Sequence, residues 1–338
     1  MTNNTSETTA NTTTSQVEAQ SISSSSEQAK QNQAKLITVT PKEREIRPWR
    51  SIVGSAFMMT YLTTPFIMCY IYFKAIQGDI LCITLSVMQI ITQIYAKRWD
   101  AWCRLLNYFD MDLYFDEFGL HFEEELAKEK VLLGIHPHNV VTLGMTLNQF
   151  KGRFGKQSIC ASRVLLYMPL LGMLHKFSGI VPVDAQNLKK LMSANKNLSI
   201  VPGGFEEATI SSSTKDKVFI KNRKGFIKFA LRYGYNVHPV YIFGENKMFE
   251  YFEKFEEFRL LMNKVKLVGL IFWSRLGLLP EPRLKVNTIV GKAIKLPQIA
   301  EPTAQDVDKY HTIYIEELKR IFDENKIKFG DNHDLIIY

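Results

Sequence analysis

An uncharged apolar run over residues 51–73 places the strongest constraint on what this chain can fold into. The segment reads SIVGSAFMMTYLTTPFIMCYIYF and holds no acidic, basic or histidine residue. A helix of about 20 apolar residues crosses the hydrocarbon core of a bilayer, and Pro65 is tolerated there as a kink. We therefore interpret the run as a membrane helix. The alternative is that it belongs to a pair of buried helices in a soluble core.

A second apolar segment, residues 80–95, follows after the short link KAIQGD at 74–79. A link of this length makes the two helices antiparallel, so both outer ends lie on one side. The second segment is shorter and carries Gln89 and Gln93, so a hairpin that dips into one leaflet competes with one that spans the bilayer. The sequence predicts a membrane-embedded helical hairpin within residues 41–99.

Basic residues flank both outer ends of this hairpin, which by the positive-inside rule face the cytosol together with the rest of the chain. These residues are Lys42, Arg44, Arg47 and Arg50 before the hairpin, and Lys97 and Arg98 after it. The cysteines fit a reducing compartment, because their spacing matches neither a CxxC pair nor a metal site, and we interpret the two that lie inside apolar segments as small buried apolar groups. They are Cys69, Cys82, Cys103 and Cys160.

Residues 1–40 form a Ser/Thr/Asn/Gln-rich segment that is almost free of large apolar side chains. Such a segment buries too little surface to offset its chain entropy, so we expect a disordered tail. It also lacks the charged and apolar regions of a secretory signal.

From residue 100 to 338, short apolar strands alternate with helical stretches, which predicts an α/β fold with a layered, largely parallel sheet and flanking helices. The predicted strands are 130–135, 158–162, 179–183, 197–202, 237–243 and 285–291. The predicted helices are 164–177, 184–195, 223–233, 247–263 and 303–326.

Two histidines, His136 and His138, follow the first of these strands and enclose Pro137. Ligands of such sheets collect at the carboxyl ends of the strands, where Gly203 and Gly204 also lie. A neutral imidazole can take a proton from an alcohol as that alcohol attacks a carbonyl. A metal site is the alternative, but the carboxylates or thiols that it needs are missing nearby in the sequence.

Four ordered blocks resemble the type-2 diacylglycerol acyltransferase family, which includes monoacylglycerol acyltransferases and wax synthases. The blocks are GIHPHN at 134–139, VPGGFEEA at 201–208, IKNRKGFIKFALRYGYNVHPVYIFGEN at 220–246 and PTAQDVDKYHTIYIEELKRIFDENKIKFG at 302–330. The resemblance implies a glycerophosphate-acyltransferase-like α/β fold behind the hairpin. Asn139 replaces the usual glycine of the first block, and Asp110 replaces the proline of the family's YFP block.

The resemblance implies acyl transfer from acyl-CoA to the hydroxyl of diacylglycerol, with monoacylglycerol or a long-chain alcohol as alternative acceptors. A thioester is already activated, so the enzyme mainly positions the alcohol, removes its proton and stabilises an oxyanion. Our hypothesis is that His138 or His136 is the general base, and His138 is favoured because Pro137 orients the residue after it. Glu207 is the candidate that holds the imidazole in its useful tautomer. A surface glutamate that caps the next helix is the alternative.

For the acyl-CoA we expect contacts from Gly203 and Gly204, whose N–H groups can form an anion nest, and from the stretch at 222–224. There Asn222 is the expected N-cap, with Arg223 and Lys224 in the first turn of the helix. Cations at a helix N-terminus oppose its dipole, so an anion such as a coenzyme A phosphate should compensate them. We expect no metal and no cofactor beyond acyl-CoA as co-substrate.

Three further segments carry expectations. His311 lies on the apolar face of the last helix and is interpreted as a packed core residue. Residues 164–177 and 263–280 suit helices that lie in a membrane interface or in the core, and the membrane is favoured for the second.

The net charge of +8 favours anionic partners, but the basic residues gather beside apolar segments, which disfavours a nucleic-acid binder. The expected partners are both substrates, membrane lipids and a possible second copy of the chain. The expected location is the endoplasmic reticulum membrane with the catalytic domain facing the cytosol, and also the lipid droplet surface. A catalytically silent lipid-droplet scaffold is the alternative of another class.

Overall fold

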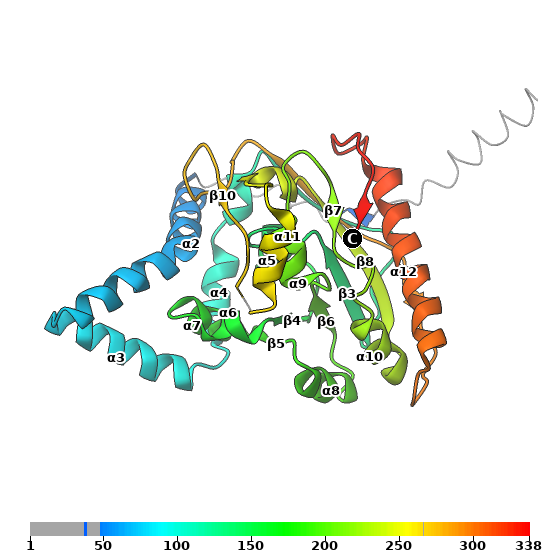
Figure 1. Ribbon diagram of the computed structural model, residues 1–338, viewed down its shortest axis with the longest axis horizontal. Coiled ribbons are helices and arrows are strands. Elements are labelled where there is room, and N and C mark those ends of the chain that lie inside the picture. The colour runs from blue at the N-terminus through cyan, green and yellow to red at the C-terminus, as the bar shows by residue number, and fades with distance from the viewer. Residues whose placement is uncertain (1–36, 39–47, 266) are drawn as a thin grey trace, which may run out of the picture. The chain divides into compact units, whose positions relative to one another are not determined.

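The computed structural model describes residues 37–38, 48–265 and 267–338. Residues 38–338 form one unit, in which a sheet carries helices on both faces (Figure 1). The tail predicted over 1–40 lies outside the described residues except for β1 (Ile37–Thr38), and so do the basic positions 42, 44 and 47.

The main sheet has the strand order β2-β11-β8-β3-β6-β4-β5. All neighbours in this order run parallel except β11 and β8, which are antiparallel, as are β12 and β8. The predicted largely parallel α/β sheet is therefore confirmed. The strands are β2 (Glu117–Phe122), β3 (Val131–His136), β4 (Ser158–Ala161), β5 (Val181–Pro182), β6 (Leu198–Ile200), β8 (Asn236–Phe243), β11 (Lys285–Val290) and β12 (Ile294–Lys295). Outside this sheet lie β7 (Lys217–Val218), β9 (Glu250–Tyr251), β10 (Phe272–Trp273) and β13 (Ile336–Ile337).

The helices come mostly where the apolar periodicity places them. The α-helices are α2 (Pro48–Ile76), α3 (Ile80–Tyr95), α4 (Asp100–Tyr108), α5 (Leu143–Phe150), α6 (Arg163–Tyr167), α7 (Leu171–Phe177), α8 (Ala185–Ser193), α9 (Gly204–Thr209), α10 (Gly225–Tyr233), α11 (Glu256–Asn263) and α12 (Ala304–Asn325). Two short 3-10 helices, η1 (Met111–Tyr114) and η2 (Glu245–Met248), complete the set.

Three predicted helices differ from the structure. The stretch 164–177 is broken into α6 and α7 because Met168 precedes Pro169 and takes extended backbone angles. The first part of 247–263 includes η2 and the strand β9, which pairs with β10. The interface helix predicted over 263–280 is wrong, since the described residues after α11 in this stretch form β10 and otherwise no helix or longer strand. The pairing of β9 with β10 outweighs the helical preference of either segment.

The alternation of side chains along β3 decides where the first histidine points. Val131, Leu133 and Ile135 belong to the apolar cluster on the face covered by α4 and α5. Leu132 belongs to the cluster on the opposite face, under α8, α10 and α12. Because side chains alternate along a strand, His136 shares the second face and points toward α12.

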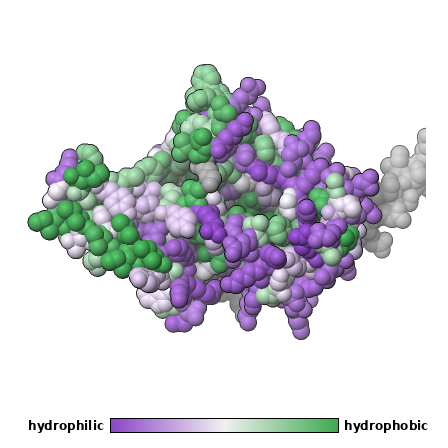
Figure 2. Space-filling view, turned by 60° about the horizontal axis from the view of Figure 1, so that its bottom comes forward, coloured by the Kyte–Doolittle hydropathy of each residue, from purple (hydrophilic) through white to green (hydrophobic). Residues whose placement is uncertain are grey.

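The hairpin predicted from the two apolar segments is present as α2 and α3, joined by residues 77–79 (Figure 1). Asp79 caps α3 by accepting from the N–H of Cys82. Among the described helices, only α2 is by itself long and apolar enough to cross a membrane, over Ile52–Ile76. Figure 2 shows apolar side chains gathered over this hairpin, at the left of the view. Cys69 is exposed and Cys82 half-exposed, so our expectation that these two are buried is wrong, and all four cysteines are free.

Polar side chains fix the hairpin to the rest of the unit. The Gln93 amide donates to the carbonyl oxygens of Leu166 and Met168, at 3.3 and 3.1 Å. At the start of α2, Arg50 lies 3.5 Å from the buried carboxylate of Asp110. Gln89 and Gln93 therefore lie on the buried face of α3, which attaches the helix to the rest of the unit. Much of the remaining helix surface is exposed.

Candidate active site

The imidazole of His136 is completely buried at the end of β3 and has a partner at each nitrogen. Its Nδ1 lies 2.9 and 3.0 Å from the two carboxylate oxygens of Glu207. Its Nε2 lies 3.1 Å from the hydroxyl of Tyr314, whose single hydrogen is donated either to this nitrogen or to the carbonyl oxygen of Gly134 at 3.1 Å. A Cβ on Gly134 would lie 2.3 Å from that hydroxyl, so glycine leaves the room that Tyr314 occupies. His136 thus has no free nitrogen to offer a substrate.

The Glu207 carboxylate is the centre of this arrangement and is almost fully buried on the short helix α9. Besides the His136 ring, it accepts from the backbone N–H of His138 and of Phe219, both at 2.9 Å. A Cβ at Gly203 would lie 2.0 Å from its Oε2, so only glycine lets the carboxylate fold back here. Gly204 follows with φ +59°, a left-handed angle that glycine adopts freely. Glu207 therefore lies next to both histidines, as predicted, and it is not the surface glutamate capping a helix that was the alternative.

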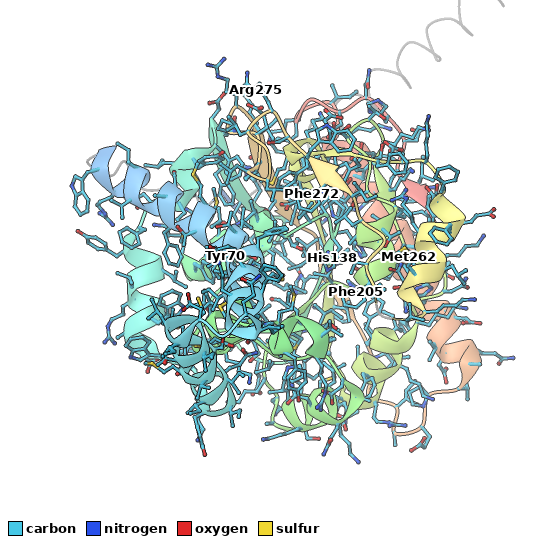
Figure 3. All side chains as sticks on the ribbon, turned by 60° about the vertical axis from the view of Figure 1, so that its left-hand side comes forward. Tyr70, His138, Phe205, Met262, Phe272 and Arg275 are labelled. Atoms are coloured by element: carbon cyan, nitrogen blue, oxygen red, sulfur yellow. The ribbon has the colours of Figure 1, made fainter. Side chains whose placement is uncertain are left out.

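His138 differs from His136 in being partly exposed. Its Nδ1 lies 2.9 Å from the carbonyl oxygen of Asn139. Because a carbonyl only accepts, this contact places the proton of the neutral ring on Nδ1 and leaves the lone pair on Nε2. Asn139 itself is buried and accepts from Ser211 at 2.9 Å. In Figure 3, which looks from the hairpin side, His138 is seen between Tyr70 of α2 and Met262 of α11.

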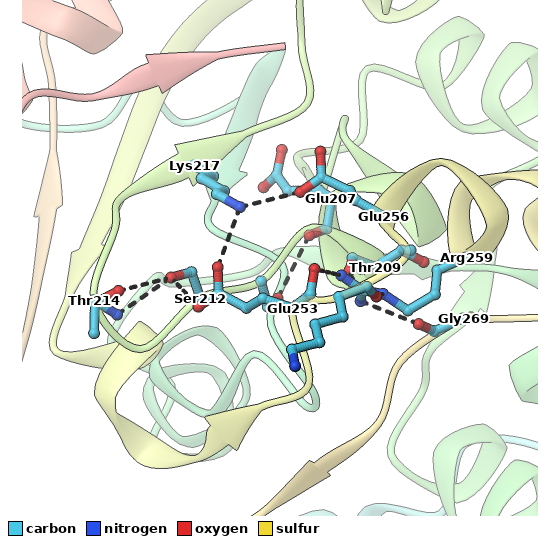
Figure 4. A network of polar contacts seen from close by, with 11 residues as sticks. Glu207, Thr209, Ser212, Thr214, Lys217, Glu253, Glu256, Arg259 and Gly269 are labelled. Carbon is cyan, nitrogen blue, oxygen red and sulfur yellow. Dashed lines mark hydrogen bonds and ion pairs between the residues drawn. The ribbon is translucent and has the colours of Figure 1, made fainter.

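The chain that follows α9 is held in place by polar contacts with α11 and its surroundings (Figure 4). Arg259, buried on α11, donates to the carbonyl oxygens of Thr209 and Gly269. Lys217 of β7 pairs with Glu256 at 3.1 Å and with Glu253 at 3.5 Å. These contacts fix both ends of residues 209–217, which lead from α9 to the Phe219 N–H that Glu207 accepts.

The basic stretch at 222–224 lies at the start of α10, but its details differ from the prediction. The helix begins at Gly225 with Lys224 at the N-cap position, so Asn222, which is exposed, is not the cap. Arg223 pairs with Glu206 of α9, and Lys224 pairs with Asp308 of α12 at 2.7 Å. The anions that compensate these two cations are thus carboxylates of the chain itself.

Sequence reasoning missed Tyr314 as part of the site. It lies on the apolar face of α12, one turn after His311, and burial raises its pKa well above the usual value. The sequence feature that could have pointed to Tyr314 is its place on the apolar face of a helix, because a buried tyrosine hydroxyl needs a hydrogen-bond partner. His311 is the packed residue expected: it contacts the carbonyl oxygen of Ile220 at 3.0 Å, and burial lowers its pKa.

Two cavities flank the hairpin. One of about 450 Å³ lies between α2 and the region of Tyr114, and it is lined mostly by apolar surface. The other, of about 510 Å³, lies past the end of α3 and includes Lys97, Arg98 and Arg163 in its wall. Neither of these two cavities is lined by His136 or His138, and the ring of His138 is partly exposed outside them.

The sequence model of the Diacylglycerol acyltransferase family matches residues 58–338, which include α2 from Met58 onward, all of α3 and the site residues just described. The chain belongs to this family. The resemblance drawn from the four sequence blocks is therefore confirmed.

Individual relatives agree with the family assignment. The chain is 32% identical to human Diacylglycerol O-acyltransferase 2 over 262 residues, which cover 70% of this chain and 65% of that protein. It is 31% identical to the Bos taurus protein of the same name, over 70% of each chain. Among solved structures, the crystal structure of the 1-acyl-sn-glycerophosphate acyltransferase from Thermotoga maritima matches 83% of this chain and 98% of its own, with a TM-score of 0.42 and 14% identity.

Proposed function

We propose that this protein transfers a fatty acyl group from acyl-CoA to the free hydroxyl of diacylglycerol, forming triacylglycerol. Family membership supports the class of reaction. The observation that carries the mechanism is the contact of His138 Nδ1 with the Asn139 carbonyl oxygen, because it leaves Nε2 as a proton acceptor on a partly exposed ring. His138 is accordingly the general base, and His136 is its support.

The reaction needs one proton to move twice. Nε2 of His138 takes the hydroxyl proton of the acceptor as its oxygen attacks the thioester carbonyl, and a tetrahedral oxyanion forms. The carbon–sulfur bond then breaks, and the coenzyme A thiolate leaves with the proton that His138 carried. Glu207 holds the backbone N–H of His138 and the ring of His136, so it fixes the position of the base without touching its ring.

For the acyl-CoA we propose contacts with Gly203 and Gly204 and with the surface formed by Asn222, Arg223 and Lys224. The pairs Arg223–Glu206 and Lys224–Asp308 are partly exposed, so coenzyme A phosphates can join or replace the carboxylates there. No metal or further cofactor takes part in this proposal.

An assay of purified His138→Ala and His136→Ala tests the assignment. We expect His138→Ala to lose at least about a hundredfold in kcat, as removal of a general base does, and to keep the melting temperature of the wild type. His136→Ala should lose both activity and stability, because it removes the ring that contacts the buried Glu207 carboxylate and the Tyr314 hydroxyl and leaves a buried cavity between them. Full activity of His138→Ala would refute the mechanism.

The acceptor alcohol is tested separately. Membranes containing the protein are incubated with labelled oleoyl-CoA and with diacylglycerol, monoacylglycerol or a long-chain alcohol in turn. Triacylglycerol as the main product supports the proposal, and another ester assigns one of the two alternatives. The absence of all three esters would indicate the catalytically silent scaffold.

The proposed location is the endoplasmic reticulum membrane or the lipid droplet surface, with residues 100–338 in the cytosol. The support is the exposed apolar surface of α2 and α3 and the basic residues Arg50, Lys97 and Arg98 at their outer ends. Protease added to intact microsomes should digest residues 100–338 if they face the cytosol. A domain in the lumen would be protected from the protease. Assembly into homo-oligomers stays a prediction.

A further inference from the structure

A cluster of three potential metal ligands lies away from the histidine site, where the C-terminal segment returns to the body. Asp216 directly precedes β7, and Asp331 and His333 precede β13, the strand that pairs parallel with β7. One ligand atom from each of the three side chains lies within 4.8 Å of the other two. We propose that Asp216, Asp331 and His333 bind a divalent cation of the zinc type. This inference rests on no step of the proposed acyl transfer.

The second observation is that buried oxygens of both carboxylates lack a partner. Asp216 and Asp331 are each about 2% exposed. Asp216 uses Oδ1 to accept from the hydroxyl of Tyr241 at 2.8 Å and from the amide of Asn246 at 3.1 Å. Its Oδ2 is buried and finds no hydrogen-bond partner within the part of the chain that the structure describes. A buried carboxylate oxygen in this position is costly unless a cation or a proton lies against it.

Asp331 repeats this pattern from the facing segment. Lys247 pairs with its Oδ1 at 2.5 Å, and the same lysine donates to the Gly330 carbonyl oxygen. Its Oδ2 is buried and, among residues 37–38, 48–265 and 267–338, has no hydrogen-bond partner. The two unpartnered oxygens therefore come from two segments that are paired as strands a few residues farther on. Two carboxylates against one lysine leave the cluster with a negative charge that a dication would compensate.

The ligand set indicates the class of cation. Two carboxylate oxygens and one imidazole nitrogen suit Zn²⁺, which binds such atoms at about 2.0–2.2 Å and keeps a fourth position for water. Mg²⁺ prefers oxygen ligands and octahedral geometry, so the imidazole disfavours it. His333 is exposed, so one of the three ligands lies at the protein surface while the two carboxylates are buried. The three ligand atoms, which lie within 4.8 Å of one another, need to move closer by only about 1 Å to reach the separations of about 3.4 Å between ligands of a tetrahedral site.

Binding here would clamp the C-terminal segment to the strand that leads into the active site. The backbone N–H of Ile336 donates to the carbonyl oxygen of Asp216, and the backbone N–H of Tyr338 donates to the carbonyl oxygen of Val218. The next residue after Val218 is Phe219, whose N–H donates to Glu207. The proposed cation is therefore structural: it holds two segments together on one side of Glu207 and touches no substrate.

The test uses the full-length protein in detergent micelles, without a histidine tag, after EDTA treatment and dialysis. ZnCl₂, MnCl₂ or MgCl₂ is then added while the melting temperature is followed, and calorimetry gives the stoichiometry. We expect one Zn²⁺ per chain, a rise of several degrees in melting temperature and a smaller response to Mg²⁺. Absence of a Zn²⁺ response, or an equal response to Mg²⁺, would overturn the assignment.

His333→Ala, Asp216→Asn and Asp331→Asn locate the site, with Asp334→Asn as the matched control in the same segment. Asp334 is exposed and pairs with Lys326. We expect at least tenfold weaker Zn²⁺ binding in the three ligand variants and wild-type binding in the control. Because His333 is exposed, its variant should fold even if the buried aspartates do not tolerate change. Wild-type Zn²⁺ binding by His333→Ala would refute the site. If Zn²⁺ changes the melting temperature of neither the wild type nor Asp331→Asn, and Asp331→Asn melts at a higher temperature than the wild type, a proton and not a cation occupies the cluster.

Discussion

The carboxylate of Glu207 lies 2.9 Å from Nδ1 of His136, and the same oxygen lies 2.9 Å from the backbone nitrogen of His138. One buried acidic group therefore fixes both histidines of the HPH sequence, one through its ring and the other through its backbone. The two rings differ in their surroundings, because that of His136 is enclosed and that of His138 is partly exposed. The general base that we propose, His138, is the exposed one of the pair.

Glu207→Gln should reduce both activity and stability. The carboxylate accepts from three N–H groups, whereas an amide presents one oxygen and turns an NH₂ group toward one of those donors. A buried donor left without a partner costs about 1–3 kcal/mol, and a small displacement of the catalytic group can cost about a hundredfold in rate. Measured kcat and the free energy of unfolding should both fall. Glu257→Gln, at an exposed position on α11, is the control, and equal behaviour of the two variants would contradict the assigned role.

Gly203→Ala should displace Glu207 without changing any titratable group. The added Cβ would lie 2.0 Å from Oε2 of Glu207, well inside contact distance, so the carboxylate must move. We expect a loss of activity similar to that of Glu207→Gln, about tenfold or more. Gly225→Ala is the matched control, because its Cβ meets open space. If the rates of the two alanine variants agree, the close approach at Gly203 is not required for catalysis.

Arg223→Ala should raise the KM for acyl-CoA by about tenfold, the expected cost of one charge-assisted hydrogen bond to a phosphate. The KM for diacylglycerol should stay near that of the wild type, because the acceptor carries no phosphate. Lys228→Ala removes a nearby exposed cation of α10 and should change neither constant. An equal rise of both KM values in Arg223→Ala would contradict the coenzyme assignment.

Glu245 should make the stability of the protein depend on pH. Its buried carboxylate accepts from the N–H groups of Leu143 and Gly144 at the start of α5, yet burial raises its pKa from 4.5 to about 7. The folded protein therefore binds more protons than the unfolded chain between those values, so stability from this group falls as pH rises through the window and is constant above it. The shift corresponds to about 3 kcal/mol at about 1.4 kcal/mol per pKa unit.

Glu245→Gln removes this titration. The difference in free energy of unfolding between wild type and variant, measured by denaturant from pH 4.5 to 8, should fall by a few kcal/mol across the window and then level off. The slope of that difference is the readout, since the variant also changes a hydrogen bond at all pH values. A difference that does not vary with pH would contradict a raised pKa at Glu245.

Local pattern was enough to place most of the sheet. The predicted strand at 130–135 is β3, and the strand at 285–291 is β11, each within about one residue, because runs of buried β-branched and aliphatic residues are what a covered sheet requires. The helix expected over 247–263 failed at its start for a nonlocal reason. Residues 250–251 pair with 272–273, and no periodicity within 247–263 reports that partner.

The candidate site shows the same limit. The HPH sequence and Glu207 were found from residues that share a family pattern, and the structure brings them together. Tyr314, on the other hand, lies 178 residues from His136 and reaches it because α12 packs across the sheet. The cluster of Asp216, Asp331 and His333 was missed because its members have no metal-ligand spacing along the chain.

By itself, the sequence determined which segments are apolar enough for a membrane hairpin, which form the parallel sheet and which residue types are available for acyl transfer. These features depend on composition and on the spacing of apolar residues at two or at three to four positions, and both can be seen within a single segment of the sequence. The tertiary structure alone decided that His136 is enclosed and His138 is accessible. That difference depends on which face of β3 meets α12, and on a Glu207 carboxylate that reaches both histidines only when α9 is packed beside the strand end.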